Sequence, residues 1–454
     1  MSAVPSLDPE RLLTVIAAMP LAATYWVAYS GGLDSSVLLH AMAALRERLP
    51  GALRAIHVHH GLQHEADAWA AHCRRSCDRL GVPLEVCELA LVPRPGESLE
   101  AFARAARYQA MAGAIGAGDM LLTAHHQDDQ AETVLLHLLR GSGVDGLAAM
   151  PRVMRWRRGY LARPLLDWSR QQLRGYAEQA RLEWVDDPSN RETAFDRNYL
   201  RREIVPRLKT RWPATAAAFA RSAGHCADAR RLLRDLAEID LSAAGGGGPD
   251  RLKVAVLERL TPARRRNLLR HWIRRQGMPV PGAAAIERIL SEVAGAGCDR
   301  TPVFRWRGAE VRRFRGELYL MPPLPSAPDP SLRLDWKGDA PLPLPDALGR
   351  LSLREIRGEG IDHQIWRKGH IQVGFRQGGE RGHPCGQAHH RTLKHLFQAW
   401  GIPPWLRDRI PLIFIDGRLA AVAGEGVFQP FCATPDAMAV SVIHTRPTRP
   451  VPKN

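Results

Sequence analysis

The run from Ser30 to Ser35 combines a tight turn, hydroxyl groups and a carboxylate in one short segment. Its two adjacent glycines let the backbone turn sharply and approach an anion, and its serines add hydroxyl donors. The carboxylate of Asp34 would repel a phosphate group unless a cation lay between them, so we predict that Asp34 and phosphate oxygens hold Mg²⁺ together. We therefore expect the whole run to bind the phosphates of a ligand: Ser30, Gly31, Gly32, Leu33, Asp34 and Ser35.

A second group of ionisable side chains occupies residues 125–133 and opens a predicted helix. His125 and Asp129 are four residues apart, and Asp129 and Glu132 are three apart, so a helix that begins early enough places all three on one face. Such a face can hold a second metal contact, a substrate ammonium or a general base. We predict catalytic roles for His125, Asp129 and Glu132. The alternatives are a well-capped helix start with solvated acids, or a zinc site for which no third ligand stands at the usual spacing.

A third group is basic and follows a loop of turn-forming residues at 186–190. Arg197 and Arg201 are one helical turn apart, and their guanidinium groups could clamp phosphates together. We predict that Arg197, Asn198 and Arg201 bind the substrate or its phosphates. The alternative is a basic helix whose side chains face only solvent.

Strands and helices alternate around these motifs, which predicts a doubly wound parallel α/β sheet. Ligands bind such sheets at the carboxyl ends of the strands. The Ser30 loop, His59-His60 and His125-His126 each follow a predicted strand directly, so we expect them to meet in one crevice. The predicted strands span residues 25–29, 53–58, 83–89 and 119–124.

The composition indicates a polyanionic partner and a reducing environment. The formal net charge is +16 and the sequence pI is about 10.2, which favours tRNA or another nucleic acid as the partner. The alternative is an arginine-rich genome, since arginine far outnumbers lysine. The seven cysteines form no C-x-x-C pair, so we expect free thiols. With no signal sequence and no long apolar run, we expect a cytoplasmic protein with no membrane partner.

The composition of residues 213–454 changes along the chain and predicts further domains. We expect the catalytic domain to span residues 1–212 and a mostly helical, tRNA-binding middle domain to span 213–321, with an arginine-dense helix at 262–276 and a hairpin within 303–320. Residues 322–345 are rich in proline and predict a linker with at most one strand. Residues 346–454 predict a small α+β domain for tRNA recognition, in which Asp416-Gly417 is a hairpin signal.

The three motifs together resemble those of the tRNA(Ile)-lysidine synthases, a family of PP-loop ATP pyrophosphatases. The resemblance is specific over roughly the first 210 residues and weaker from Lys368 to Leu412. It implies a fold of the PP-loop, adenine nucleotide alpha hydrolase-like type. It rests on the Ser30–Ser35 run, on residues 125–133, and on Asp187, Ser189, Asn190, Arg197, Asn198 and Arg201.

The resemblance also implies a reaction. Enzymes of this family use ATP and Mg²⁺ to adenylate the 2-keto oxygen of the wobble cytidine in a CAU anticodon. The ε-amine of free L-lysine then displaces AMP, so the products are lysidine, AMP and pyrophosphate. The codon that is read changes from AUG to AUA, and the charging identity changes from methionine to isoleucine. The implied partners are tRNA(Ile) and L-lysine, and a homodimer is one assembly that the sequence allows.

Three other functions compete with this interpretation. A tRNA thiolase of the same superfamily needs a sulfur carrier, often paired cysteines or an iron–sulfur cluster, and C-x-x-C pairs are missing here. A small-molecule adenylating ligase would need neither the basic charge nor the C-terminal region. A tRNA-binding protein with an inactive nucleotide site would not need Asp34, Asp129 and Glu132.

Overall fold

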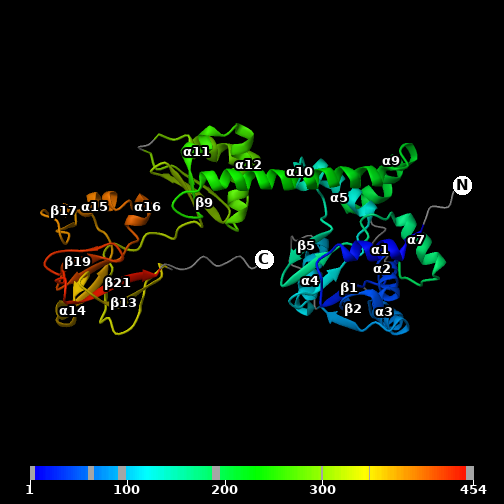
Figure 1. The fold of residues 1–454 in the computed structure, drawn as a ribbon, viewed down its shortest axis with the longest axis horizontal. Helices are drawn as coiled ribbons and strands as arrows, with labels where there is room; N and C mark the ends of the chain where they lie inside the picture. The colour runs from blue at the N-terminus through cyan, green and yellow to red at the C-terminus, as the bar shows by residue number, and fades with distance from the viewer. Residues whose placement is uncertain are drawn as a thin grey trace. The chain divides into compact units, whose positions relative to one another are not determined.

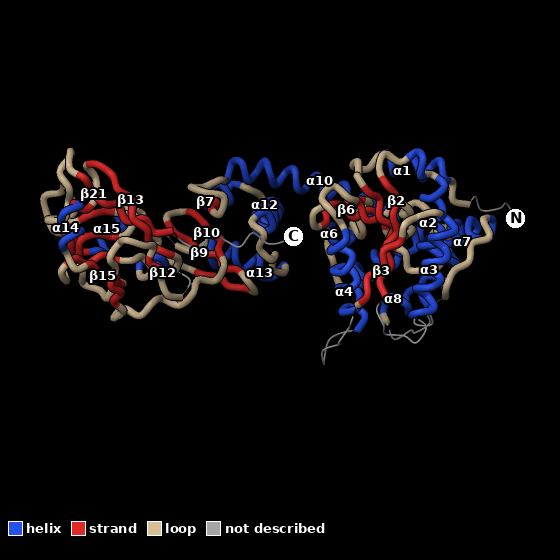
Figure 2. Tube along the Cα trace, turned by 90° about the horizontal axis from the view of Figure 1, so that it is seen from below, coloured by secondary structure: helices blue, strands red, loops and turns tan. Residues whose placement is uncertain are grey.

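The computed structural model describes residues 6–59, 66–89, 99–186, 195–297, 300–346 and 348–445. The chain divides into two compact units, one formed by the first 235 residues and one that begins at Leu236. Figure 1 follows the chain through both units, and Figure 2 shows their helices and strands. The finer domain boundaries expected at residues 212, 321 and 345 stay predictions.

The first unit is built on a six-stranded sheet with the order β3-β2-β1-β4-β6-β5. All neighbours from β3 to β6 pair in parallel, and only β5 runs antiparallel to its neighbour β6. The predicted doubly wound α/β fold is therefore confirmed, with an added β5–β6 hairpin at one edge. The strands are β1 (Thr24–Ala28), β2 (Ala52–His59), β3 (Leu84–Glu88), β4 (Met120–Leu122), β5 (Val153–Trp156) and β6 (Gly159–Ala162).

Both faces of this sheet are covered, because side chains along a strand alternate between its two faces. On β1, Tyr25 and Val27 join the larger core, while Trp26 joins a second core with Ile56 and Leu121. Helices pack on each face (Figure 2). They are α1 (Pro9–Ala17), α2 (Leu33–Ala44), α3 (Ala66–Leu80), α4 (Leu99–Ala114), α5 (Gln127–Leu139), α6 (Val144–Leu147) and α7 (Arg170–Gln179).

The first unit ends in a run of helical segments that begins with the residues of the third sequence motif. These are α8 (Asp196–Tyr199), a π-helical stretch at Leu200–Ile204 and α9 (Val205–Arg211). The long helix α10 (Thr215–Ala244) follows, close to the predicted range of 214–241. None of the helices within the described ranges has the length and hydropathy that crossing a membrane requires.

The second unit begins with a helical region that packs on a four-stranded antiparallel sheet, β7-β10-β9-β8. The hairpin expected about Arg307-Gly308 is confirmed by the pairing of β8 with β9. Its second strand, expected to run from Glu310 to Leu320, is divided in two, because Arg315 and Gly316 both have positive φ and reverse the chain there. The elements are β7 (Arg251–Lys253), α11 (Val254–Arg259), α12 (Pro262–Arg275), α13 (Ala283–Arg288), a π-helical stretch (Ile289–Ala294), β8 (Val303–Trp306), β9 (Ala309–Phe314) and β10 (Glu317–Met321).

The rest of the second unit is the expected α+β region, with sheets β11-β15-β18-β19-β20 and β12-β13-β21-β14. The proline-rich segment differs from the prediction, because it holds two short strands that pair with these sheets. The hairpin at Asp416-Gly417 is confirmed. The strands are β11 (Arg333–Asp335), β12 (Leu342–Pro343), β13 (Arg350–Arg357), β14 (Ile361–Asp362), β15 (Ile371–Gly374), β16 (Arg381–Gly382), β17 (Arg391–Thr392), β18 (Leu412–Ile415), β19 (Arg418–Val422), β20 (Gly426–Val427) and β21 (Met438–Thr445), with helices α14 (His363–Lys368), α15 (Leu393–Ala399) and α16 (Pro404–Arg407).

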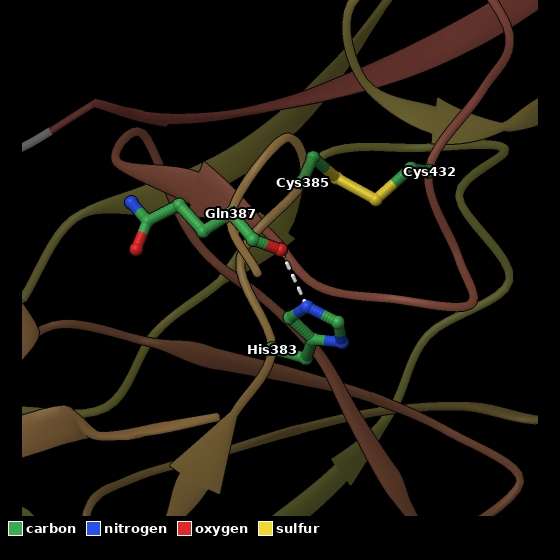
Figure 3. Close-up of a disulfide and its surroundings, with 4 residues drawn as sticks. All are labelled: His383, Cys385, Gln387 and Cys432. Atoms are coloured by element: carbon green, nitrogen blue, oxygen red, sulfur yellow. Dashed lines mark hydrogen bonds between the residues drawn. A yellow bond between two sulfur atoms is a disulfide. The ribbon is translucent and has the colours of Figure 1, made fainter. Parts of the chain in front are cut away.

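The expectation that all cysteines are free thiols is wrong for one pair. Cys385 and Cys432 form a disulfide with Cα atoms 6.1 Å apart, and His383 beside them donates a hydrogen bond to the carbonyl of Gln387 (Figure 3). The partners are 47 residues apart in sequence, so no local spacing pattern could reveal the pair. The other cysteines among the described residues are free thiols: Cys73, Cys77, Cys87 and Cys226.

Replacing Leu122 tests whether the buried core on the sheet stabilises the first unit. This side chain on β4 is fully buried in the larger core, so Leu122→Ala should lower the free energy of unfolding by ~2–5 kcal/mol. Leu139→Ala is the matched control, because Leu139 is 75% exposed and its loss should change the free energy by about 0.5 kcal/mol or less. Urea denaturation of the full chain measures both. Equal effects would contradict the described core.

Candidate active site

The Ser30 loop joins β1 to α2 and is held by its own hydroxyl groups. The Oγ atoms of Ser30 and Ser35 are 3.0 Å apart, and Ser35 Oγ donates to the carbonyl of Gly32 at 3.0 Å. Gly31 has φ 81°, and a Cβ there would lie 3.1 Å from Cys73 Sγ, so both the backbone angle and the space require glycine. Helix α2 starts with Gly32 as its N-cap, and no side chain caps its first N–H groups. The predicted strand, turn and helix are all present, and this arrangement suits phosphate binding.

Asp34 lies in the first turn of α2 and contacts a residue from a different helix start. Its Oδ2 atom is 3.5 Å from His126 Nε2, while its Oδ1 atom is buried and has no hydrogen-bond partner among the described residues. A buried carboxylate oxygen without a donor is costly unless a cation or another ligand satisfies it. The site of Asp34 thus has a free ligand position of the kind that Mg²⁺ prefers.

His126 is the N-cap of α5, and its side chain is only 2% exposed. Its Nε2 atom lies 3.5 Å from both Asp34 Oδ2 and Asp129 Oδ2, and its Nδ1 atom lies 3.8 Å from Asp128 Oδ2. Burial alone would lower the pKa of His126, but the three surrounding carboxylates raise that pKa to about 9. His126 is therefore an imidazolium that links the starts of α2 and α5.

His125 was the histidine that sequence spacing favoured, but the structure places it differently. Helix α5 begins at Gln127, so His125 precedes the helix and does not share a helical face with Asp129. Its Nδ1 atom lies 2.9 Å from Thr123 Oγ1. Burial lowers the pKa of His125 to about 3, and the nearby Asp129 does not offset that effect, so the ring is neutral. The sequence did contain a signal for His126, since it stands three residues before Asp129 at a helix start.

Asp129 and Glu132 meet the two arginines that the third motif supplies. Arg201 Nε is 2.7 Å from Glu132 Oε1 and its Nη2 is 2.9 Å from Asp129 Oδ1, while Arg197 Nε is 2.9 Å from Glu132 Oε2. Although burial raises the pKa of Asp129, the nearby histidines and arginines hold it well below its usual value. These guanidinium groups thus donate to carboxylates in the structure, and phosphate binding by Arg197, Asn198 and Arg201 stays a prediction.

Asp128 has two partners that the sequence did not point to. Lys209 on α9 donates to Asp128 Oδ1, and the backbone N–H of Arg170 at the start of α7 donates to Asp128 Oδ2 at 2.8 Å. Burial raises the pKa of Asp128, but these two donors together with His126 produce a net lowering. Lys209 is 81 residues away from Asp128, so only the fold reveals the pair.

The remaining predicted residues are one histidine with an acidic partner and four residues outside the described ranges. His59 ends β2 and pairs with Asp67 at 3.0 Å. His60, Asp187, Ser189 and Asn190 are not among the described residues. Within the described ranges, no three histidine, cysteine or acidic side chains are placed to bind one metal ion, so the zinc alternative gains no support.

A cavity of about 490 Å³ lies in the first unit, and no residue of the Ser30 loop lines it. Gln130, Arg152, Asp167, Ala223 and Asp228 are among the residues that line it, and Asp34 and His126 are not. This cavity is therefore not the place where a ligand would contact Asp34 or His126.

Removing Arg201 tests how far the buried acids depend on it. Glu132 has a side chain that is 2% exposed, so Arg201→Met leaves a buried carboxylate short of its partner and should destabilise the first unit by ~3–5 kcal/mol. Arg174→Met is the matched control, because the Arg174–Glu178 pair is 66% and 58% exposed and should contribute about 1 kcal/mol or less. Thermal and urea unfolding measure both variants. A loss no larger than in the control would show that the buried pair is not needed.

Comparison with known protein families divides the chain into three matched regions. Residues 10–208 match the model of the PP-loop domain. Residues 252–319 match the TilS substrate binding domain, and residues 371–444 match the TilS substrate C-terminal domain. The PP-loop match contains the Ser30 loop, the start of α5, Arg197 and Arg201, and it ends one residue before Lys209.

Several curated proteins are similar over almost their whole length, and each is named tRNA(Ile)-lysidine synthase. The protein of Methylococcus capsulatus is 46% identical over 93% of this chain and 96% of its own length. That of Alkalilimnicola ehrlichii is 47% identical over 96% of this chain and 97% of its own, and that of Coxiella burnetii is 44% identical over 93% of each. Because this similarity covers nearly the full length of both partners, the chain belongs to the tRNA(Ile)-lysidine synthase family.

Proposed function

We propose that this chain uses ATP to convert the wobble cytidine of a tRNA(Ile) with a CAU anticodon into lysidine. As a member of its family the chain is a ligase that forms a carbon–nitrogen bond. The observation that carries the proposal is the junction of Asp34 and His126, which brings the phosphate loop and the acidic helix start together in one site. The matches to two TilS substrate domains support tRNA as the substrate.

The Ser30 loop is the part that would bind the pyrophosphate moiety of ATP. The match to the PP-loop domain supports the use of ATP. The uncapped N–H groups at the start of α2 and the hydroxyl groups of Ser30 and Ser35 are the donors that a polyphosphate needs. In the first step the 2-keto oxygen of cytidine attacks the α-phosphorus, and the bond to the β-phosphate oxygen breaks to release pyrophosphate.

Asp34 is the residue that would hold Mg²⁺. Its unpartnered Oδ1 atom fits a divalent cation, and the opposite side of the carboxylate is held by His126. When bound, Mg²⁺ would neutralise the phosphate charge that builds up as pyrophosphate leaves. His126 orients the carboxylate, and its positive charge balances part of the acidic cluster.

Asp129 and Glu132 would serve the lysine step by electrostatics. The neutral ε-amine of lysine attacks C2 of the adenylated cytidine, the C2–O bond breaks so that AMP leaves with the former keto oxygen, and the proton that the nitrogen loses passes to solvent. The low pKa of Asp129 makes this carboxylate a weak base, so it suits binding of an ammonium group better than removal of its proton. Arg197 and Arg201 hold both carboxylates in place through ion pairs.

The competing functions have less support. Cys73 and Cys77 are buried, and burial raises the pKa of each thiol to about 12, which does not suit a thiolase nucleophile. Cys385 and Cys432 are already joined to each other. A binding protein with an inactive nucleotide site would leave the buried network of Asp34, His126 and Asp129 without a chemical purpose.

Incorporation of labelled lysine tests the proposed reaction directly. With ATP and Mg²⁺, the purified chain should attach lysine to a transcript of tRNA(Ile) that has a CAU anticodon. A transcript with methionine identity and the same anticodon is the control and should stay unlabelled. Pyrophosphate release that depends on tRNA, without lysine incorporation, would keep the adenylation step but refute lysine as the nucleophile.

Asp34→Asn tests the role of the loop carboxylate. The amide keeps the shape of the side chain but loses the charge that would hold Mg²⁺, so tRNA-dependent pyrophosphate release should fall by roughly 100-fold or more. Asp78→Asn is the matched control, because Asp78 is exposed on α3. Unchanged pyrophosphate release in Asp34→Asn would rule out the assignment.

A further inference from the structure

Lys209 stands out because the first 252 residues contain no other lysine. The whole chain has 63 lysines and arginines, and every other such position among residues 1–235 is an arginine. Lysine differs from arginine in carrying a compact charge on a flexible stem rather than a planar fork. The contacts of this one lysine therefore show where a compact ammonium group is used instead of a guanidinium group.

The ammonium group of Lys209 lies against the acidic start of α5. It reaches from α9 to Asp128 Oδ1, and the side chains of Lys209 and Asp128 are 39% and 11% exposed. The other oxygen of Asp128 accepts from the N–H of Arg170 at 2.8 Å. Asp128 is thus held at both oxygens, by a charge from α9 and by the backbone of α7.

Two further contacts connect Asp128 to the Ser30 loop. Asp128 Oδ2 is 3.8 Å from His126 Nδ1, and His126 Nε2 is 3.5 Å from Asp34 Oδ2. Four side chains from three helices and a helix cap therefore form one series of charge contacts, in which His126 Nδ1 makes no hydrogen bond to a described residue. They are Lys209 on α9, Asp128 on α5, His126 at its N-cap and Asp34 on α2.

We propose that Lys209 is a positioning residue for ATP, which acts through Asp128 and His126 to hold Asp34 against the phosphate loop. The proposal rests on the proposed function, because it assigns Lys209 to the nucleotide step of that reaction. Two physical effects support it. Lys209 fixes one end of the series, and its charge offsets the carboxylates that would otherwise repel a polyphosphate.

The charge effect predicts which substrate is affected. Removing Lys209 adds one net negative charge to a site that already holds four carboxylates, from Asp34, Asp128, Asp129 and Glu132. Phosphate groups would feel this charge directly. A lysine ammonium has the opposite sign and would not be repelled, so a general loss of folding and a specific loss of nucleotide positioning have different signatures.

The experiment compares Lys209→Met, Lys209→Arg and Arg207→Met in the full chain. Arg207 is the matched control, because it lies on the same helix and its side chain is 79% exposed. Tritiated lysine incorporation and pyrophosphate release are measured while Mg–ATP and lysine are varied in turn. We expect Lys209→Met to raise the KM for Mg–ATP about tenfold, the effect of losing one charge-assisted hydrogen bond, while the KM for lysine changes by less than about twofold. Lys209→Arg keeps the charge but not the compact ammonium group, so it should recover only part of the loss, and Arg207→Met should match the wild type.

A double-mutant cycle with Asp128→Asn tests the series itself. If Lys209 acts through Asp128, Lys209→Met should add little to the effect of Asp128→Asn. Independent effects that multiply, or equal changes in the KM for Mg–ATP and for lysine, would overturn the proposal. If Lys209→Met does not fold, Asp128→Asn keeps the side-chain shape and should raise the KM for Mg–ATP on its own. A wild-type chain that makes no product would instead refute the proposed function, so the two failures are distinguishable.

Discussion

The pairing of two buried carboxylates with two arginines is the interaction on which the site depends. Asp129 and Glu132 are almost fully buried at the start of α5, and buried carboxylates are stable only with positive partners and full hydrogen bonding. Arg197 and Arg201 satisfy them from a segment more than 60 residues later in the chain. The chain after α7 must therefore return to α5. This return also brings α9, and with it Lys209, to the acidic cluster.

The parallel sheet decides where this cluster meets the phosphate loop. Strands β1 and β4 are direct neighbours, so the helices that follow them, α2 and α5, both begin at the same edge of the sheet. Asp34 and His126 occupy those two helix starts and can approach within 3.5 Å. One site thus joins backbone N–H and hydroxyl donors with a group of acids, which is the combination that the proposed adenylation followed by amine attack requires.

The positive charge of the chain has more than one purpose. The arginine-dense helix α12 was expected to contact tRNA phosphates, but several of its arginines have partners within the second unit. Arg264 pairs with the buried Asp240, Arg266 pairs with Glu287, and Arg275 pairs with Glu238. Arg265 donates to backbone carbonyl groups. Part of the excess of arginine therefore stabilises the fold, and it cannot all be counted as a surface for nucleic acid.

The sequence by itself determined the features that depend on local order. Alternating strands and helices predicted the parallel sheet, the Ser30 run predicted the turn between a strand and a helix, and the motifs predicted the family, because each of these is encoded within a few neighbouring residues. The tertiary structure decided which side chains meet. It selected His126 over His125 through the start of α5, paired Arg201 with Glu132, joined Cys385 to Cys432 and brought Lys209 to Asp128. These contacts join residues that packing alone brings together, and helix starts shift by a residue or two without a clear local signal, so spacing could not determine them.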